Sequence, residues 1–255
     1  MFFAVSFLLL LPLLCVVNAA TPGFNCNIIP GKLTQVDAGS GEVYGVNSND
    51  DIFRWEKNYW KHIDGKLIHV TVGPAKVWGV NRATQVFKFQ NNGWIPVTGS
   101  LKQIDAGGNK FLAGVNSQDN VYCSRQKSAD TPVYWKSMDG SLKYYACGLW
   151  GCWGVNRFDN VYFRHGVTAA SCQGTQWQQI DGSLVMIETS TEGSVYGVNS
   201  AGNAYRRNGI SATTPMGTSW TQLDLGYNFK HVTYGDGYLW LITPTDDILQ
   251  CAVTN

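Results

Sequence analysis

The phrase Val43-Tyr44-Gly45-Val46-Asn47 returns four more times along the 255-residue chain. The later copies are Val77-Trp78-Gly79-Val80-Asn81, Leu112-Ala113-Gly114-Val115-Asn116, Cys152-Trp153-Gly154-Val155-Asn156 and Val195-Tyr196-Gly197-Val198-Asn199. Their central glycines are 34, 35, 40 and 43 residues apart. A period of this length indicates a repeat architecture in which each copy is one supersecondary unit.

Each repeat unit contains four short segments with the character of β-strands. A segment such as 101–107 precedes the phrase, and a polar turn with a further strand such as 159–164 follows it. The unit closes on Trp-x-x-Ile/Met/Leu-Asp, at 60–64, 135–139, 177–181 and 220–224, with a variant at 94–99. Apolar and polar residues partly alternate, and the turns are rich in Gly, Asn and Asp. Four strands in about 40 residues are typical of a β-propeller blade, whereas the 3.6-residue periodicity of a helical solenoid is absent.

The sixth unit is incomplete at the carboxyl end of the chain. Residues 229–233, 238–242 and 247–251 supply three strands. The fourth strand is predicted at the other end, because residues 26–33 align without gaps on residues 60–67. We therefore predict an all-β, six-bladed propeller whose last blade is closed by the amino-terminal strand, so that neither end leaves an unpaired edge. Its repeats cover roughly 33–65, 66–99, 100–140, 141–182, 183–225 and 226–255 plus 24–32.

The first 19 residues read as a secretory signal peptide. An uncharged apolar run from Phe2 to Val17 is followed by small residues, which predicts cleavage after Ala19, with Ala20 as the alternative. A membrane anchor is the rival interpretation, but the run is short for a span of about 20 residues. We expect a secreted, extracellular protein with one domain at 20–255 and no membrane insertion.

The charge balance argues against a nucleic-acid partner. Nineteen Lys and Arg face 18 Asp and Glu, which leaves a net charge of +1, and only 15% of residues are charged. Binding to phosphate backbones needs a clustered excess of Lys and Arg. The low charged fraction also argues against a disordered chain or a coiled coil.

Six cysteines remain after removal of the signal peptide, and secretion indicates three disulfides. Ring closure places Cys26 and Cys251 on neighbouring strands of one blade, so we pair them. Cys147 and Cys152 flank a turn and suit a bridge across a hairpin. Cys123 and Cys172 then pair by elimination and would connect adjacent blades. A zinc site is disfavoured because no Cys-x-x-Cys pair occurs and the four histidines are scattered.

The recurring Leu-x-x-Ile-x-x-Gly, Val-Tyr/Trp-Gly-Val-Asn, Val-Tyr-x-Arg and Trp-x-x-Ile-Asp-Gly phrases resemble tectonin-type propeller repeats. With a signal peptide and six units, the chain resembles the secreted fish-egg lectin group over about residues 24–251. The resemblance implies carbohydrate binding, of N-acetylglucosamine-type or bacterial-surface sugars, and a role in egg protection or innate immunity. Several similar sites would act by avidity on a dense glycan array, and a homodimer would double their number.

Candidate sugar-binding residues are aromatic rings that depart from the repeat register, together with repeated polar residues of the turns. A ring held on a rigid turn can stack on a sugar face. The closing tryptophans, in contrast, are expected to pack blade against blade. The candidates are Trp150, Trp55, Tyr59, Phe158, Asn47, Asp64, Asp139 and Asp181.

Catalysis and metal binding find little support in the sequence. The Ser-x-Asp-x-Gly-x-x-Trp box of sialidases and the Gly-x-Ser-x-Gly elbow are both absent, and the histidines are expected to be surface or packing residues. We predict a protein that is not an enzyme and needs no cofactor. A propeller glycosidase, a structural or protein-binding egg component, and calcium held by Asp50-Asp51 or Asp246-Asp247 remain the alternatives.

Overall fold

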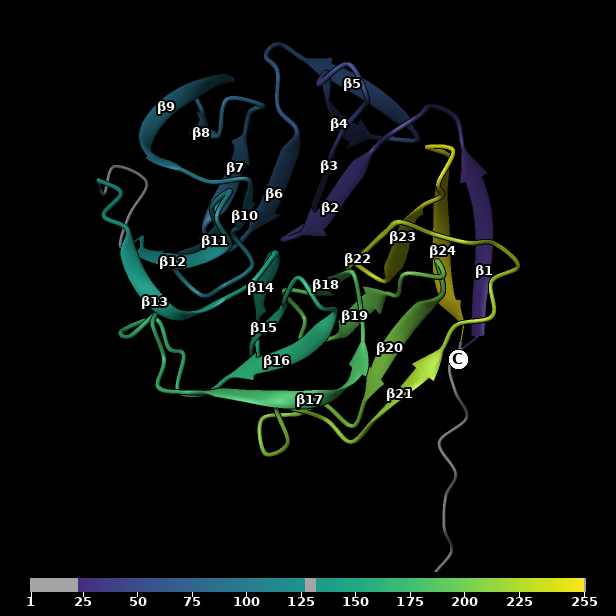
Figure 1. The fold of residues 1–255 in the computed structure, drawn as a ribbon. Helices are drawn as coiled ribbons and strands as arrows, with labels where there is room; N and C mark the ends of the chain where they lie inside the picture. Colours follow the sequence, from purple (N-terminus) through teal and green to yellow (C-terminus); the bar gives the residue numbers. More distant parts are fainter. Residues whose placement is uncertain (1–22, 127–131, 255) are drawn as a thin grey trace, which may run out of the picture.

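The computed structural model describes residues 23–126 and 132–254, and these form six four-stranded antiparallel sheets arranged around a central axis (Figure 1). The predicted signal peptide lies outside the described residues. The six sheets are the blades of a propeller, numbered here in chain order. The prediction of a six-bladed β-propeller is thus confirmed.

The strands are given from the innermost outward. Blade 1 consists of β2 (Gln35–Gly39), β3 (Glu42–Val46), β4 (Ile52–Glu56) and β5 (Tyr59–Ile63), and blade 2 of β6 (His69–Gly73), β7 (Lys76–Val80), β8 (Gln85–Gln90) and β9 (Gly93–Ser100). Blade 3 consists of β10 (Gln103–Asp105), β11 (Phe111–Val115), β12 (Asn120–Arg125) and β13 (Lys136–Ser141). Blades 4 to 6 are β14 (Tyr144–Gly148), β15 (Gly151–Val155), β16 (Asn160–Arg164) and β17 (Trp177–Ser183); β18 (Met186–Thr189), β19 (Val195–Val198), β20 (Ala204–Asn208) and β21 (Ser219–Gln222); and β22 (His231–Gly235), β23 (Tyr238–Ile242), β24 (Ile248–Thr254) and β1 (Gly23–Ile29).

The two ends of the chain meet in blade 6, as predicted. Strand β1 pairs antiparallel with β24 over seven residues, and Cys26 lies directly opposite Cys251 in that register. The outer edge of blade 6 is therefore made by the amino-terminal strand (Figure 1). This arrangement closes the ring.

The repeated Gly-Val-Asn phrase is explained by the packing of a leucine from the linker between blades. A Cβ atom on Gly45 would lie 2.5 Å from Leu33 Cδ1, closer than carbon atoms approach in folded proteins. Leu33 itself is almost completely buried. The glycine thus lets the linker leucine fill the space beside the second strand of the next blade, which fixes how each blade follows the last.

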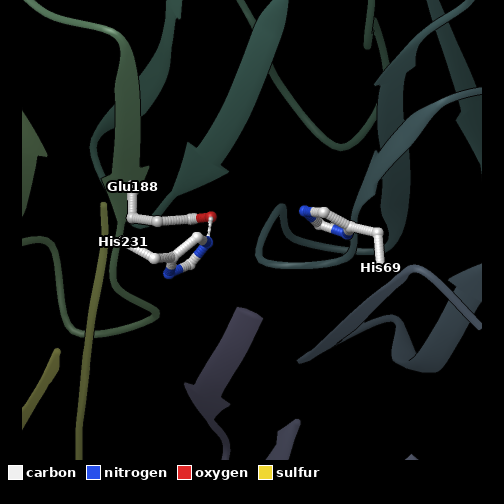
Figure 2. Close-up of side chains that lie close together, drawn as sticks. All are labelled: His69, Glu188 and His231. Atoms are coloured by element: carbon white, nitrogen blue, oxygen red, sulfur yellow. Dashed lines mark ion pairs between the residues drawn. The ribbon is translucent and has the colours of Figure 1, made fainter. Parts of the chain in front are cut away.

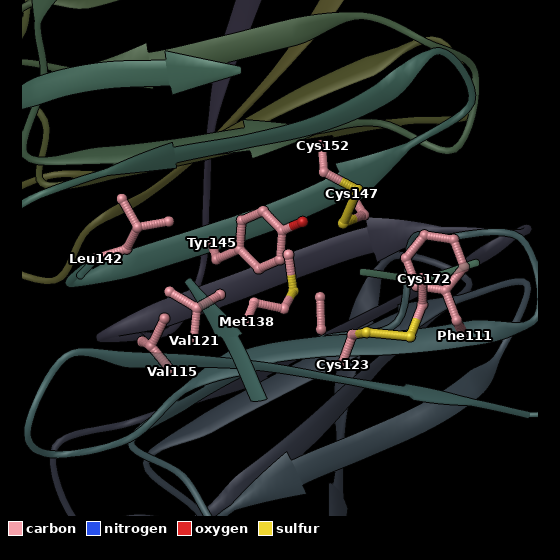
Figure 3. Packing of buried hydrophobic residues seen from close by; sticks show 11 residues of the cluster. Phe111, Val115, Val121, Cys123, Met138, Leu142, Tyr145, Cys147, Cys152 and Cys172 are labelled. Carbon is pink, nitrogen blue, oxygen red and sulfur yellow. A yellow bond between two sulfur atoms is a disulfide. The ribbon is translucent and has the colours of Figure 1, made fainter. Parts of the chain in front are cut away.

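The structure contains the three disulfides that the sequence predicts: Cys26–Cys251, Cys123–Cys172 and Cys147–Cys152. Figure 3 shows the last two within the apolar core between blades 3 and 4, beside Met138 and Tyr145. Cys123 belongs to β12 and Cys172 to the segment between β16 and β17, so this bridge joins neighbouring blades. Within the described ranges, no helix is long and apolar enough to cross a membrane.

Candidate functional site

Two crevices with the same lining lie between consecutive blades. The crevice between blades 3 and 4 has a volume of about 290 Å³, and the one between blades 4 and 5 about 230 Å³. Each is lined by a Gly-Ser-Leu linker, an asparagine, a tyrosine and a tryptophan. The two sets are Gly140, Ser141, Leu142, Asn156, Tyr162 and Trp177, and Gly182, Ser183, Leu184, Asn199, Tyr205 and Trp220.

The tryptophan of each crevice is fixed against the linker by its indole nitrogen. Trp177 Nε1 donates to Asp139 O at 2.8 Å, and Trp220 Nε1 donates to Asp181 O at 2.7 Å. Gly140 has a φ of 96°, and a Cβ atom there would lie 2.8 Å from Trp177 Nε1. Glycine is therefore required on steric and conformational grounds. The ring edge is held in place while part of the ring stays exposed to solvent.

A buried arginine supports each indole from behind. The Arg164 guanidinium lies 4.9 Å from the Trp177 ring, and its Nη2 is 2.6 Å from Asp139 Oδ1. This hydrogen bond lowers the pKa of Asp139. In the next crevice Arg207 lies 5.1 Å from the Trp220 ring, and its Nη1 is 2.8 Å from Asp181. Both arginine side chains are only 4% exposed, so each crevice rests on a rigid, charge-compensated base.

The asparagine of the repeat has a local role, and the tyrosine supplies the second ring. Asn199 Oδ1 accepts hydrogen bonds from the backbone of Ala201 and Asn203, which builds the turn. Its amide nitrogen lies 3.4 Å from the Tyr205 hydroxyl, which in turn donates to Gln222 Oε1 at 3.2 Å. The crevice therefore presents two partly exposed rings with polar groups between them.

The boundary between blades 2 and 3 carries the same types of side chain at the equivalent positions. These are Ser100, Tyr122 and Trp135, and Trp135 Nε1 donates to Thr98 O at 2.7 Å. Earlier in the ring, phenylalanine replaces the tyrosine at Phe53 and Phe87. The tyrosine at this position is thus confined to three consecutive blades, 3, 4 and 5.

Three of the eight residues predicted from sequence lie beside these crevices. Asp139 and Asp181 provide the carbonyl groups that hold the tryptophans and the carboxylates that pair with the arginines. Phe158 is 74% exposed in the turn that follows Asn156. The structure therefore gives both aspartates a supporting role at the crevice base.

The other five predicted residues are dispersed over the molecule. Trp55 packs against Trp60 and Trp240 at centroid distances of 5.0 and 5.4 Å. Tyr59 is exposed near Glu56, and the Asp64 side chain is fully exposed.

The remaining two lie on different blades. Trp150 is 38% exposed at the tip of the β14–β15 hairpin. Asn47 Oδ1 accepts from the backbone of Asn49 and Asp51, as its counterparts in other repeats do.

Sequence reasoning missed the rings that line the crevices: Tyr162, Trp177, Tyr205 and Trp220. The closing tryptophan was expected only to pack blades together, because it recurs in five of the six units. A usable signal is the residue opposite the repeat glycine, which is tyrosine at 122, 162 and 205 but phenylalanine at 53 and 87. That difference separates the units of Tyr162 and Tyr205, which line the two crevices, from the first two units.

The innermost strands carry a second cluster of polar side chains at the centre of the ring, called here the channel cluster. His69, Glu188 and His231, from blades 2, 5 and 6, bring their ligand atoms within 4.8 Å of one another (Figure 2). The Tyr144 hydroxyl lies between them: it donates to Glu188 Oε1 and is 3.1 and 3.2 Å from the Nε2 atoms of His69 and His231. His-Val-Thr at 69–71 and again at 231–233 is the sequence signal for this pair.

Burial controls the charge of this channel cluster. It lowers the pKa of both His69 and His231 to about 3 and raises the pKa of Glu188 well above its usual range. Two imidazoles and a carboxylate form a donor set that suits a transition-metal ion. The hydrogen bonds of Tyr144 connect the same three groups directly, so the cluster is also a coherent hydrogen-bonded network.

The acidic pairs considered for calcium are matched with basic side chains. Asp50 pairs with Arg82 and Asp51 with Lys66, both at 2.6 Å. Asp246 pairs with Lys230, and Asp247 with Lys32 at 2.7 Å. Each carboxylate therefore already has a cation, and the four do not converge on a single oxygen cage.

The fold and its repeated crevices define this chain as a repeat-type six-bladed β-propeller. A model of the tectonin domain matches residues 32–244, and the chain is 45% identical over 239 residues to a fish-egg lectin of Cyprinus carpio. That alignment covers 91% of this chain and 100% of the carp protein. The chain therefore belongs to the tectonin family, in the group represented by the carp fish-egg lectin.

Solved structures with low sequence identity share the architecture. A protein of unknown function from Bacteroides thetaiotaomicron has a TM-score of 0.60 at 14% identity, covering 91% of this chain and 76% of its own. The Cps50 (Swd1) β-propeller domain of Myceliophteria thermophila has a TM-score of 0.59 at 8% identity, covering 90% and 100%. At such identities the likeness shows the fold alone.

Proposed function

We propose that this protein is a secreted lectin that binds N-acetylglucosamine-type or microbial surface glycans in the crevices between its blades, without catalysis and without a metal cofactor. The observation that carries the proposal is the recurrence of one lining set in two successive crevices. Membership in the tectonin family and the lectin name of the carp relative point to the same ligand class.

The chemistry of the crevices supports a sugar ligand. The exposed parts of Trp177 and Tyr162, and of Trp220 and Tyr205, offer ring surface for the apolar face of a sugar. Tyrosine hydroxyls and the Ser141 and Ser183 side chains offer hydrogen bonds to sugar hydroxyls and to an acetamido group. Because the indoles are already fixed, binding needs little further ordering.

Repetition and the disulfides support the biological part of the proposal. Weak sites on one propeller gain strength together when the target is a dense glycan surface, and a homodimer would extend the effect. Three disulfides favour an oxidising, extracellular setting. A role in egg protection or innate defence is part of this proposal, and multivalent binding to glycan surfaces together with the fish-egg lectin name of the carp relative supports it.

The test is calorimetric titration of the oxidised protein with N-acetylglucosamine and its short oligomers, with and without EDTA. The double variant Trp177→Ala/Trp220→Ala removes both stacking rings and should weaken binding at least about tenfold. The conservative pair Tyr162→Phe/Tyr205→Phe keeps the rings and should reduce affinity by a smaller factor. EDTA should leave the wild-type affinity unchanged.

The exposed ring of Phe158 provides a discriminating variant. Phe158→Ala leaves the crevice lining in place, so it should bind as the wild type does. If Phe158→Ala abolished binding while the Tyr→Phe pair had no effect, the site would lie outside the crevices. If folded wild-type protein bound no sugar on a broad glycan array, the lectin proposal itself would be wrong.

A further inference from the structure

The crevice between blades 5 and 6 differs from the repeated ones in size. Its volume is about 620 Å³, against 290 and 230 Å³ for the crevices described above. Its lining includes Asn203, Asp224, Tyr227, Thr243 and Asp247. This crevice lies at the seam where the two ends of the chain complete the ring, and we refer to it as the seam crevice.

The larger volume follows from two replacements that the strand register identifies. Leu249 faces Ile28 across blade 6 just as Tyr205 faces Gln222 across blade 5. Cys26 faces Cys251 as Trp220 faces Arg207. The two aromatic walls of the ordinary crevice are therefore a leucine and a half-cystine here. Two aromatic rings are thus missing from this boundary, which leaves more open space between the blades.

The same replacement leaves a carboxylate without its usual cation. Asp224 stands four residues after Trp220, as Asp181 stands four residues after Trp177. Asp181 pairs with Arg207, but the position of Arg207 in blade 6 is held by Cys251. Asp224 is exposed and makes no ion pair within the described part of the chain, whereas the nearby Asp247 is paired with Lys32.

The linker that carries Asp224 also supplies a new ring. The segment from Trp220 to the buried Phe229 is two residues longer than the equivalent segment from Trp177 to Leu184. Tyr227 lies in this longer linker, 51% exposed, and lines the seam crevice. An aromatic ring therefore remains, but it comes from the linker between blades and not from the outer strand.

We propose that the seam crevice binds a saccharide that carries a free ammonium group, such as a glucosamine residue without its acetyl group. The ammonium would take the place of the missing guanidinium and donate to the Asp224 carboxylate, and Tyr227 would stack on the sugar face. Asn203 lines the same crevice and offers a further hydrogen bond to a sugar hydroxyl. The ligand class rests on the proposed lectin function, but the crevice and its residues are different.

The experiment compares a glucosamine tetramer with the fully N-acetylated tetramer, by nuclear magnetic resonance and calorimetry on the intact oxidised protein. The glucosamine tetramer should shift the backbone amides of residues 203, 224–228 and 243–247, and its affinity should fall with added salt. Asp224→Asn should weaken its binding about tenfold and leave binding of the acetylated tetramer unchanged. Tyr227→Ala should weaken it by a smaller factor.

A matched control removes a carboxylate from the same blade at a distance from the crevice. Asp236→Asn, in the β22–β23 turn, should leave the affinity for both tetramers at the wild-type value. The inference is wrong if the glucosamine tetramer does not bind, if it shifts only the amides lining blades 3 to 5, or if Asp224→Asn binds it as tightly as the wild type. Binding of the acetylated tetramer in those cases would leave the lectin function standing, and failure of both tetramers would remove both.

Discussion

One pair of facing positions differs sharply between the seam and the neighbouring blades. In blades 4 and 5 the outer strand carries a tryptophan opposite an arginine, at Trp177–Arg164 and Trp220–Arg207. In blade 6 the same positions are Cys26 and Cys251, joined by a disulfide. In these two blades the arginine stacks on the indole and pairs with an aspartate of the preceding blade, and these contacts hold the outer strand. Where two chain ends meet, a covalent bond replaces them, and this replacement opens the crevice beside it.

The seam disulfide is expected to contribute the largest single stabilisation of this comparison. It links residues 225 apart in sequence, whereas Cys147 and Cys152 are only five apart. By chain-entropy estimates, the double variant Cys26→Ser/Cys251→Ser should lower the free energy of unfolding by about 5 kcal/mol, and Cys147→Ser/Cys152→Ser by about 2 kcal/mol. Denaturant unfolding of each oxidised variant measures the difference. Equal losses would show that the seam is held chiefly by its noncovalent contacts.

The pH dependence of folding stability tests the innermost strand of blade 6 separately. His231 of blade 6 and His69 of blade 2 face each other across the channel, with Glu188 and Tyr144 between them. Because burial lowers both histidine pKa values to about 3, the unfolded chain binds protons first as pH falls below 6.5. Each histidine should therefore cost about 1.4 kcal/mol of stability per pH unit between pH 6.5 and 3.

The channel carboxylates act in the opposite direction. Burial raises the pKa of Asp37, Asp105 and Glu188 in the folded state. As pH falls, these carboxylates take up protons in the folded chain before they do so in the unfolded chain, which stabilises the folded state. The test therefore compares the pH dependence of thermal unfolding in the wild type and in the double variant His69→Gln/His231→Gln. The variant should lose less stability than the wild type between pH 6.5 and 4.5. Parallel pH profiles for the two proteins would contradict the assignment of neutral histidines.

The fold was predictable because its determinants are local and repeated. The glycines at 45, 79, 114, 154 and 197 recur since each must admit a linker leucine, and the alignment of residues 26–33 on 60–67 identified the closing strand. The crevices were harder to predict from the sequence. Their walls bring together residues up to 38 positions apart, such as Gly140 with Trp177 and Gly182 with Trp220. The tryptophan recurs in five of the six units, a repetition typical of packing. The channel cluster joins three blades, and the sequence signals only two of its members, through the repeated His-Val-Thr of 69–71 and 231–233.

The smallest expected effect is the difference in stabilisation between the two tryptophan–arginine pairs. Arg207 Nε donates to Met216 O, and its Nη1 binds Asp181. Arg164 Nε donates to Gln173 O and its Nη2 binds Asp139, but in the described part of the chain its Nη1 is buried without a hydrogen-bond partner. A buried N–H without a partner costs about 1–3 kcal/mol, so Arg164 stabilises its blade less than Arg207 does.

Replacing each arginine with methionine retains an unbranched side chain that fills space beside the indole and removes the guanidinium. Arg207→Met should lower the free energy of unfolding by about 1 kcal/mol more than Arg164→Met, because only Arg164→Met removes an unpaired buried donor together with the favourable contacts. Paired denaturant titrations at neutral pH can resolve this difference. Equal losses for the two variants would mean that Arg164 Nη1 has a partner in solution, such as a bound water, and that the two blades are equivalent at their outer edge.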